Sequence, residues 1–226
     1  MMTLFHCVGA RSFRPLWTLE ALGLPYELKM LPFPPRVLKR EYLEINPLGT
    51  VPLFVDGNVR MTESAAICQY LCAKHGPTTL QVETHEDDFG AYLNYLHMGE
   101  ATLTFPQTLV LRYSRFEPEE RRMPTVAADY AKWFLARLRK LEPMLQERDY
   151  LCAGRFTSAD ISVGYALMLA EMIDLSAEFT PAVAAYWARL KEEPSYQRAL
   201  KAEHQAAIAQ DVSPVPAPLQ FANSIR

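Results

Sequence analysis

The sequence has few cysteines and no long apolar runs. Its four cysteines include no C-x-x-C pair and are too sparse for a disulfide scaffold in a chain of 226 residues. Cys68 and Cys72 stand one helical turn apart among apolar residues, so we expect both to be small buried side chains. The five histidines are scattered, without carboxylate or thiol neighbours at ligand spacing, and we expect no bound metal.

Membrane and nucleic-acid partners are not expected either. No apolar run approaches the ~20 residues of a membrane-spanning helix. Residues 1–10 lack the basic segment and the long apolar segment of a signal peptide, so we expect a cytoplasmic protein. The formal net charge of −3 gives no general electrostatic reason to bind nucleic acid. With 50% hydrophobic and 22% charged residues, the composition is that of an ordinary globular protein.

The first part of the chain alternates extended and helical patterns. Their order is β-α-β-α-β-β-α, which predicts a small α/β domain at residues 1–76. The strands are expected at residues 3–8, 26–31 and on either side of Asp56-Gly57-Asn58, and the helices at residues 12–23, 38–46 and 62–76.

The second part is helical almost throughout. After a linker at residues 77–85, apolar residues recur at helical spacing, which predicts an all-helical domain at residues 86–210. A tail at residues 211–226 holds three prolines and cannot continue the last helix. Two joined domains leave a cleft, where ligand pockets often form.

One helix of this second part is unusually apolar. The segment at residues 157–173 has so few charges that we expect it to be the central helix, enclosed on all sides. Thr157 and Asp160 have the spacing of a capping box at its start. We interpret this pair as a folding element and assign it no catalytic role.

A proline interrupts an apolar run near the end of the first domain. Pro52 lies in V-P-L-F-V, residues 51–55, which otherwise resembles a strand. Proline lacks the N–H that a sheet ladder needs, so it leaves neighbouring backbone groups without a regular partner. The sequence therefore raises the question of what uses those groups.

Four stretches together resemble the cytosolic glutathione S-transferases of the bacterial kind. They are EALGLPYELKMLPF, EYLEINPLGTVPLFVDGNVRMTESAAICQYL, GRFTSADISVGYAL and VAAYWARLKEEPSYQRAL. The resemblance covers residues 3–204, and its most specific part is N-P-L-G-x-V-P…E-S placed ahead of a T-x-A-D helix. It implies a thioredoxin-like N-terminal domain, an all-helical C-terminal domain, a homodimer and glutathione as co-substrate.

The resemblance also implies how glutathione is held. Pro52 would be cis, and Val51 would present its N–H and C=O to the cysteinyl unit as a strand does. Ser64 and the start of its helix would hold the γ-glutamyl carboxylate, and Glu63 would accept from the ammonium. The alternatives are an edge-strand proline with no ligand, and residues 62–64 that only cap a helix.

The glycine carboxylate and the thiol have less obvious partners. Many relatives have a lysine where this chain has Thr50. Lys39, or else Arg36 or Arg40, would then supply the positive charge that holds the glycine carboxylate. The alternative is that all three are solvated surface residues. Relatives also have a thiol-activating serine where this chain has Ala10.

Three groups can replace that serine. They are the Ser12 hydroxyl, the Arg11 charge, and the helix N-terminal N–H groups around Arg11 and Ser12 acting together. We favour the last, with Ser12 as the side chain involved. The alternative is that Ser12 only caps the helix that begins at Phe13.

The second substrate is expected over the helical domain. Residues 92–121 interleave polar and aromatic side chains with apolar ones, among them Tyr95, His97, Thr104, Phe105 and Tyr113. The expected reaction is attack of the glutathione thiolate on a small hydrophobic electrophile. Two alternatives remain: glutathione-dependent isomerisation, peroxide reduction or disulfide reduction on the same fold, and a non-catalytic protein that binds glutathione or another ligand.

Overall fold

The computed structural model describes residues 1–220, which form two compact units. The first unit contains Met1–Thr78 and Glu192–Ala217, and the second contains Thr79–Lys191 and the described residues from Pro218 onward. Along residues 1–220, no helix is both long enough and apolar enough to cross a lipid bilayer. The six residues after Gln220, the end of the predicted tail, lie outside the described part of the chain.

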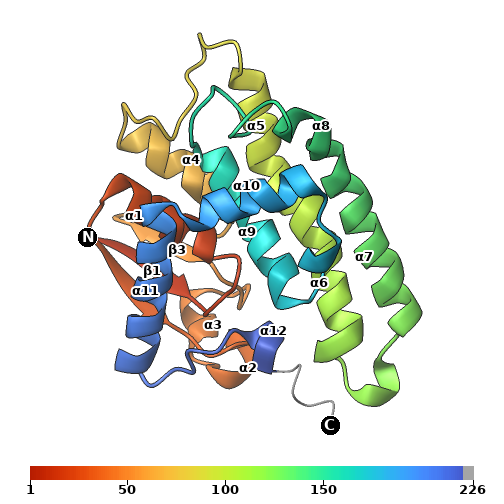
Figure 1. Cartoon of the computed structure of the whole chain (residues 1–226). Helices are drawn as coiled ribbons and strands as arrows, with labels where there is room; N and C mark the ends of the chain where they lie inside the picture. Colours follow the sequence, from red (N-terminus) through yellow and green to blue (C-terminus); the bar gives the residue numbers. More distant parts are fainter. Residues whose placement is uncertain (221–226) are drawn as a thin grey trace. The chain divides into compact units, whose positions relative to one another are not determined.

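A four-stranded mixed sheet lies at the centre of the first unit. Its strands are β1 (Met2–His6), β2 (Tyr26–Met30), β3 (Leu53–Asp56) and β4 (Val59–Met61), in the order β2-β1-β3-β4 (Figure 1). β1 pairs with β2 in parallel, and β3 pairs with β1 and β4 in antiparallel fashion. The predicted thioredoxin-like arrangement is confirmed.

The helices of this unit differ from the prediction in one place. α1 (Phe13–Leu22) and α4 (Ser64–Lys74) form where expected. The helix expected at residues 38–46 is instead two short helices, α2 (Pro35–Leu38) and α3 (Tyr42–Ile45). The break occurs at Lys39, whose φ of −140° and ψ of 67° are not helical.

The C-terminal helix α11 (Pro194–Ala209) packs on this first unit, against α1 and β2. Figure 1 shows it in blue beside α1. The Trp17 indole N–H donates to the Ser195 hydroxyl at 2.9 Å, and the Trp17 ring meets the Tyr196 ring edge-on. Just past the helix, the Gln210 side chain bonds to the Met30 N–H at 2.9 Å. The first unit therefore includes a segment that the sequence assigned to the helical domain.

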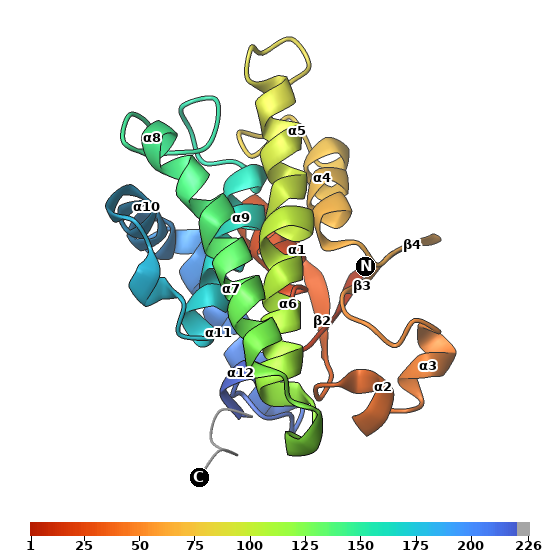
Figure 2. The same ribbon diagram turned by 90° about the vertical axis from the view of Figure 1, so that its right-hand side faces the viewer.

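The second unit is helical and is built around α9. Its segments are α5 (Phe89–Met98), η1 (Gly99–Thr104), α6 (Phe105–Leu111), η2 (Arg112–Phe116), η3 (Glu119–Arg121), α7 (Pro124–Leu138), η4 (Arg139–Leu141), α8 (Glu142–Leu145), α9 (Ser158–Met172), η5 (Ser176–Glu178) and α10 (Pro181–Lys191), and α12 (Ala217–Gln220) follows near the end of the chain. Figure 2 shows α5, η1 and α6 as one long rod with α7 beside it. α9 is buried from Ser158 to Ala170, which confirms that it is the enclosed helix.

A fully buried carboxylate ties the start of α9 to its surroundings. Asp160 accepts hydrogen bonds from the N–H and the hydroxyl of Thr157, at 2.8 and 2.9 Å, which confirms the predicted capping box. It also accepts from the Leu151 N–H at 3.0 Å and the Tyr186 hydroxyl at 2.9 Å. Burial raises the pKa of Asp160 to about 6, while these four donors favour its anion.

Candidate functional site

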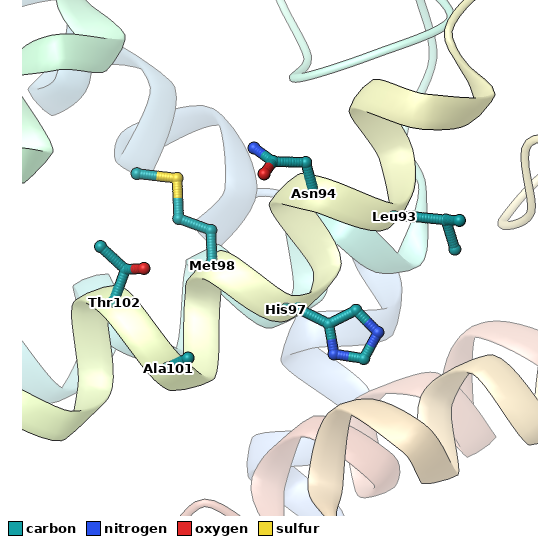
Figure 3. A pocket seen from close by; sticks show the side chains of 6 residues that line it. All are labelled: Leu93, Asn94, His97, Met98, Ala101 and Thr102. Carbon is teal, nitrogen blue, oxygen red and sulfur yellow. The ribbon is translucent and has the colours of Figure 1, made fainter.

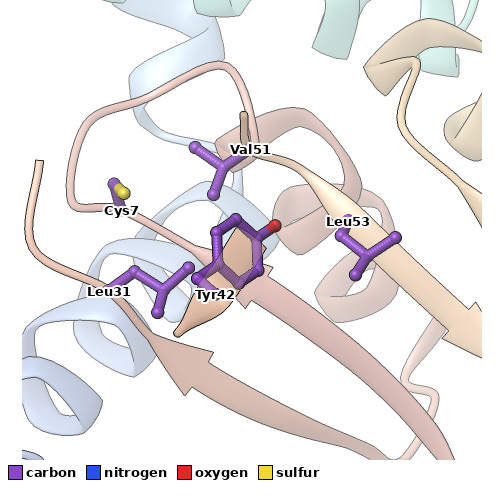
Figure 4. Close-up of a cluster of buried hydrophobic side chains, with 5 residues drawn as sticks. All are labelled: Cys7, Leu31, Tyr42, Val51 and Leu53. Carbon is purple, nitrogen blue, oxygen red and sulfur yellow. The ribbon is translucent and has the colours of Figure 1, made fainter. Parts of the chain in front are cut away.

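The backbone at Val51 has an unusual conformation. The Val51–Pro52 bond is cis, as the resemblance implied. Within residues 1–220, neither the N–H nor the C=O of Val51 makes a hydrogen bond. The Val51 side chain is only 7% exposed and packs in a cluster with Cys7, Leu31, Tyr42 and Leu53 (Figure 4). The cluster holds the side chain, while the backbone N–H and C=O of Val51 have no partner among residues 1–220.

The loop before Val51 is held by its own polar contacts. The Thr50 C=O accepts from the Tyr42 hydroxyl and the Asn46 amide, each at 2.9 Å. Gly49 has a φ of +60°, and a Cβ there would lie 2.7 Å from the Arg36 Cβ, so only glycine fits. The conformation of the loop N-P-L-G-T-V-P thus depends on the positive φ of Gly49 and on the two side-chain hydrogen bonds to the Thr50 C=O.

The start of α4 offers a second polar group. Ser64 is its first residue and is 1% exposed. Glu63 precedes it with an extended backbone and an exposed side chain that makes no capping hydrogen bond. The carboxylate of Glu63 therefore does not cap the helix, and the first-turn N–H groups of α4 have no acceptor within their own helix.

A buried arginine lies against Ser64. Arg14, on α1, has no exposed surface, and its Nη1 donates to the Ser64 hydroxyl at 3.3 Å. A guanidinium stays charged in a protein, so it adds positive potential where the dipole of α4 is already positive. The sequence analysis missed this role. The signal was an arginine beside Phe13 and Trp17, within the apolar pattern of α1.

Lys39 and Arg36, two candidates for the cation expected near Thr50, have different surroundings. The Lys39 ammonium is paired with the Glu41 carboxylate at 2.8 Å. Arg36 lies against Gly49, one residue before Thr50, and its side chain is exposed. Since both partners of this surface ion pair are largely exposed, it does not decide whether Lys39 holds a glycine carboxylate, which stays a prediction.

The turn between β1 and α1 is organised differently from the prediction. Ser12 has a helical backbone, makes no capping bond and has no exposed surface. Its hydroxyl lies 2.7 Å from Nδ1 of His6. The alternative that Ser12 only caps the helix is therefore wrong, whereas its predicted part in activating the thiol stays a prediction. Arg11, the other candidate, is partly exposed.

Two buried residues complete this turn, and the sequence analysis gave neither a role in the site. Nε2 of His6 lies 2.7 Å from Oε2 of Glu203, and the same oxygen accepts the Gly9 N–H at 3.1 Å. Glu203 belongs to α11, 197 residues further along the chain than His6. No local spacing signals such a pair.

A cavity of about 460 Å³ lies in the second unit, along α5 and η1 (Figure 3). Its lining residues are Leu93, Asn94, His97, Met98, Ala101 and Thr102. His97 is among those expected in an acceptor pocket. Thr104, also expected there, is buried and donates to the Gly99 C=O at 2.7 Å. Three of the six lining side chains are apolar, and the other three supply an imidazole, an amide and a hydroxyl.

All four cysteines are free and buried, which confirms the interpretation of Cys68 and Cys72 as buried side chains. Burial raises the pKa of Cys7 to about 12 and that of Cys68 and Cys152 to about 11. Across residues 1–220, no three His, Cys, Asp or Glu side chains gather as a metal ion requires.

We expect these thiols to be inert in the folded protein. A free cysteine has a pKa of about 8.5, and only the thiolate reacts. Because the folded thiols of Cys7, Cys68 and Cys152 keep their protons up to about pH 11, labelling by an aromatic disulfide should stay slow when the pH is raised through the range in which free cysteine ionises. In concentrated guanidinium chloride the same reagent should label all four thiols. Rapid labelling of the native protein would contradict this and would point to an exposed thiolate.

Comparison with known proteins places this geometry in a family. Residues 4–79 match the family model described as "Glutathione S-transferase, N-terminal domain". The chain is 32% identical to Glutathione S-transferase GstA of Escherichia coli O157:H7 over 214 residues, which cover 89% of this chain and 98% of that protein. It is 36% identical to Glutathione S-transferase 3 of Schizosaccharomyces pombe over 103 residues, or 46% of this chain and 43% of that protein.

Solved structures show the same fold. The glutathione transferase Ure2p5 of Phanerochaete chrysosporium, cocrystallised with 1-(S-glutathionyl)-2,4-dinitrobenzene, superposes with a TM-score of 0.78 at 26% identity, covering 92% of this chain and 96% of that one. Ure2p8 of the same fungus, with oxidized glutathione, gives a TM-score of 0.79 at 22% identity, covering 94% and 97%.

Proposed function

Because the chain belongs to the glutathione S-transferase family, we propose that it catalyses attack of the glutathione thiolate on a small hydrophobic electrophile. The observation that carries this proposal is the unpaired N–H and C=O of Val51 beside the cis Pro52, within the part of the chain that the structure describes. A tripeptide can pair with both groups as a strand does, which fixes the position of its thiol.

The γ-glutamyl end of glutathione is assigned to the start of α4. Its carboxylate accepts from the Ser64 hydroxyl and the first-turn N–H groups, with the Arg14 charge behind Ser64. The exposed Glu63 carboxylate accepts from the ammonium group. The carboxylate and the ammonium on one carbon thus meet the Ser64 hydroxyl, backed by the Arg14 charge, and the Glu63 carboxylate.

The glycine carboxylate, the thiolate and the electrophile are assigned to other groups of the protein. Arg36, beside Gly49 and Thr50, takes the glycine carboxylate in place of Lys39. The partly exposed Arg11 stabilises the thiolate together with the N–H groups around Arg11 and Ser12, since this chain has Ala10 in place of the usual serine. The cavity lined by His97 receives the electrophile, because Leu93, Met98 and Ala101 give it an apolar part that suits a nonpolar molecule. The enzyme works as a cytoplasmic homodimer.

The test is retention on immobilised glutathione, followed by turnover. We expect elution by free glutathione and conjugation of 1-chloro-2,4-dinitrobenzene above the uncatalysed rate. Reduction of cumene hydroperoxide without conjugation would instead favour the reductase alternative. Retention without turnover of either compound would favour a non-catalytic ligand-binding protein, and absence of retention would overturn the proposal.

A further inference from the structure

We propose that His97 is a catalytic residue for electrophiles with a conjugated carbonyl group, and that its ring N–H donates to the carbonyl oxygen while the thiolate adds to the double bond. This inference deepens the proposed function and rests on it, because the electrophile has to lie in the cavity along α5 and η1. It names one substrate class, α,β-unsaturated carbonyl compounds, and one side chain that recognises it.

The backbone that carries His97 is held by contacts on both sides of this residue. A Cβ at Gly99 would lie 2.5 Å from the Ser162 C=O oxygen, so η1 and α9 touch through their backbones. The Ser162 hydroxyl donates to the Leu96 C=O at 2.6 Å, and the Thr104 hydroxyl donates to the Gly99 C=O at 2.7 Å. η1 is a π-helix, a geometry that is frequent at functional sites. Groups that act on a developing charge need such a fixed support.

The side chains that line the cavity form two rows along the helix (Figure 3). One row is Leu93, His97 and Ala101, and the other is Asn94, Met98 and Thr102. His97 therefore stands between two apolar side chains of its own row. A molecule with a carbon skeleton and one polar atom suits this order, and a volume of about 460 Å³ is large enough for it.

The polar side chains of this cavity are not used by the protein itself. Within the described part of the chain, the side chains of Asn94, His97 and Thr102 make no hydrogen bond. The next two threonines along the same rod behave differently, because the hydroxyls of Thr104 and Thr108 each donate to a backbone C=O at 2.7 Å. The imidazole of His97 is also exposed, so its N–H is available to a bound molecule.

Addition to a conjugated carbonyl is the reaction that makes use of such a donor. The thiolate sulfur forms a bond to the β-carbon, the C=C electron pair moves to the bond next to it, and the C=O electron pair moves onto oxygen as an enolate. The His97 N–H donates to that oxygen and stabilises its charge. A solvent proton then reaches the α-carbon and replaces the one that the thiol lost on ionisation. The product is the sum of glutathione and electrophile, and nothing leaves.

The experiment compares kcat/KM for two electrophiles at saturating glutathione. With 4-phenyl-3-buten-2-one the oxygen gains charge, whereas with benzyl chloride the charge leaves as chloride. His97→Phe keeps a planar ring and removes the N–H. We expect it to lower kcat/KM for the enone about tenfold or more relative to that for benzyl chloride. His97→Gln, which restores a donor, should recover most of the enone activity.

The matched control is His85→Phe. His85 is also an exposed histidine, it makes no hydrogen bond along residues 1–220, and it does not line the cavity. This variant should leave both values of kcat/KM unchanged. If His97→Phe behaves as this control does, or lowers kcat/KM equally for both electrophiles, the imidazole does not act on the carbonyl oxygen and the inference fails.

Failure of the proposed function would look different. A wild-type protein that conjugates benzyl chloride but not the enone would overturn this inference alone. A wild-type protein that is not retained on immobilised glutathione and conjugates neither electrophile would overturn the proposed function itself.

Discussion

Asp160→Ala should lower the free energy of unfolding of the second unit by about 3–5 kcal/mol. The wild-type carboxylate is fully buried and accepts from Leu151, Thr157 and Tyr186. Its removal leaves four donors without their acceptor, and an unpaired buried donor costs about 1–3 kcal/mol. Since a domain is stable by only about 5–15 kcal/mol, much of the variant should be unfolded or aggregated. Urea titration followed by circular dichroism measures the change.

Two further variants make this test specific. Tyr186→Phe removes one of the four donors and should cost about 1 kcal/mol. Asp149→Ala removes a carboxylate that is 74% exposed and pairs with Arg189 at 2.8 Å, so it should change stability by less than about 0.5 kcal/mol. An Asp160→Ala protein as stable as Asp149→Ala would show that the buried contacts of Asp160 do not support α9.

Local sequence patterns predicted the helices and strands, but not that α11 packs against α1 and β2 of the first unit. The strands around Asp56-Gly57-Asn58 and the capping box of α9 depend on neighbouring residues, and both are confirmed. The attachment of α11 to β2 and α1 depends on Ser195 and Gln210 meeting residues near the start of the chain. Helical spacing shows which face of a helix is apolar, but not which domain buries it.

The candidate site also contains one part that the sequence predicted and other parts that it did not. The cis bond at Val51–Pro52 was predicted because the string around Pro52 is contiguous and resembles a family. Arg14 lies 50 residues from Ser64 along the chain, and no spacing rule links them. The alternative that Ser12 caps α1 is wrong because a buried imidazole lies against its hydroxyl, a contact that the local sequence does not show.

Ser64→Ala should weaken glutathione binding about ten- to hundredfold. A hydrogen bond to a charged group contributes about 1.5–3 kcal/mol, and the proposed partner of this hydroxyl is the γ-glutamyl carboxylate. The variant also removes the acceptor of the Arg14 Nη1 group, so the guanidinium that supports the carboxylate loses one of its anchors. Isothermal titration of glutathione into the protein gives Kd directly.

The control for this loss must separate binding from stability. Ser195→Ala also removes a buried serine hydroxyl that accepts from a side-chain N–H in the first unit, and it should leave Kd for glutathione unchanged while lowering stability to a similar extent. Ser64→Thr keeps the hydroxyl and should restore most of the affinity. If Ser64→Ala binds glutathione as tightly as Ser195→Ala, the γ-glutamyl carboxylate does not lie at the start of α4, because a charged group that loses a buried donor cannot keep its full affinity.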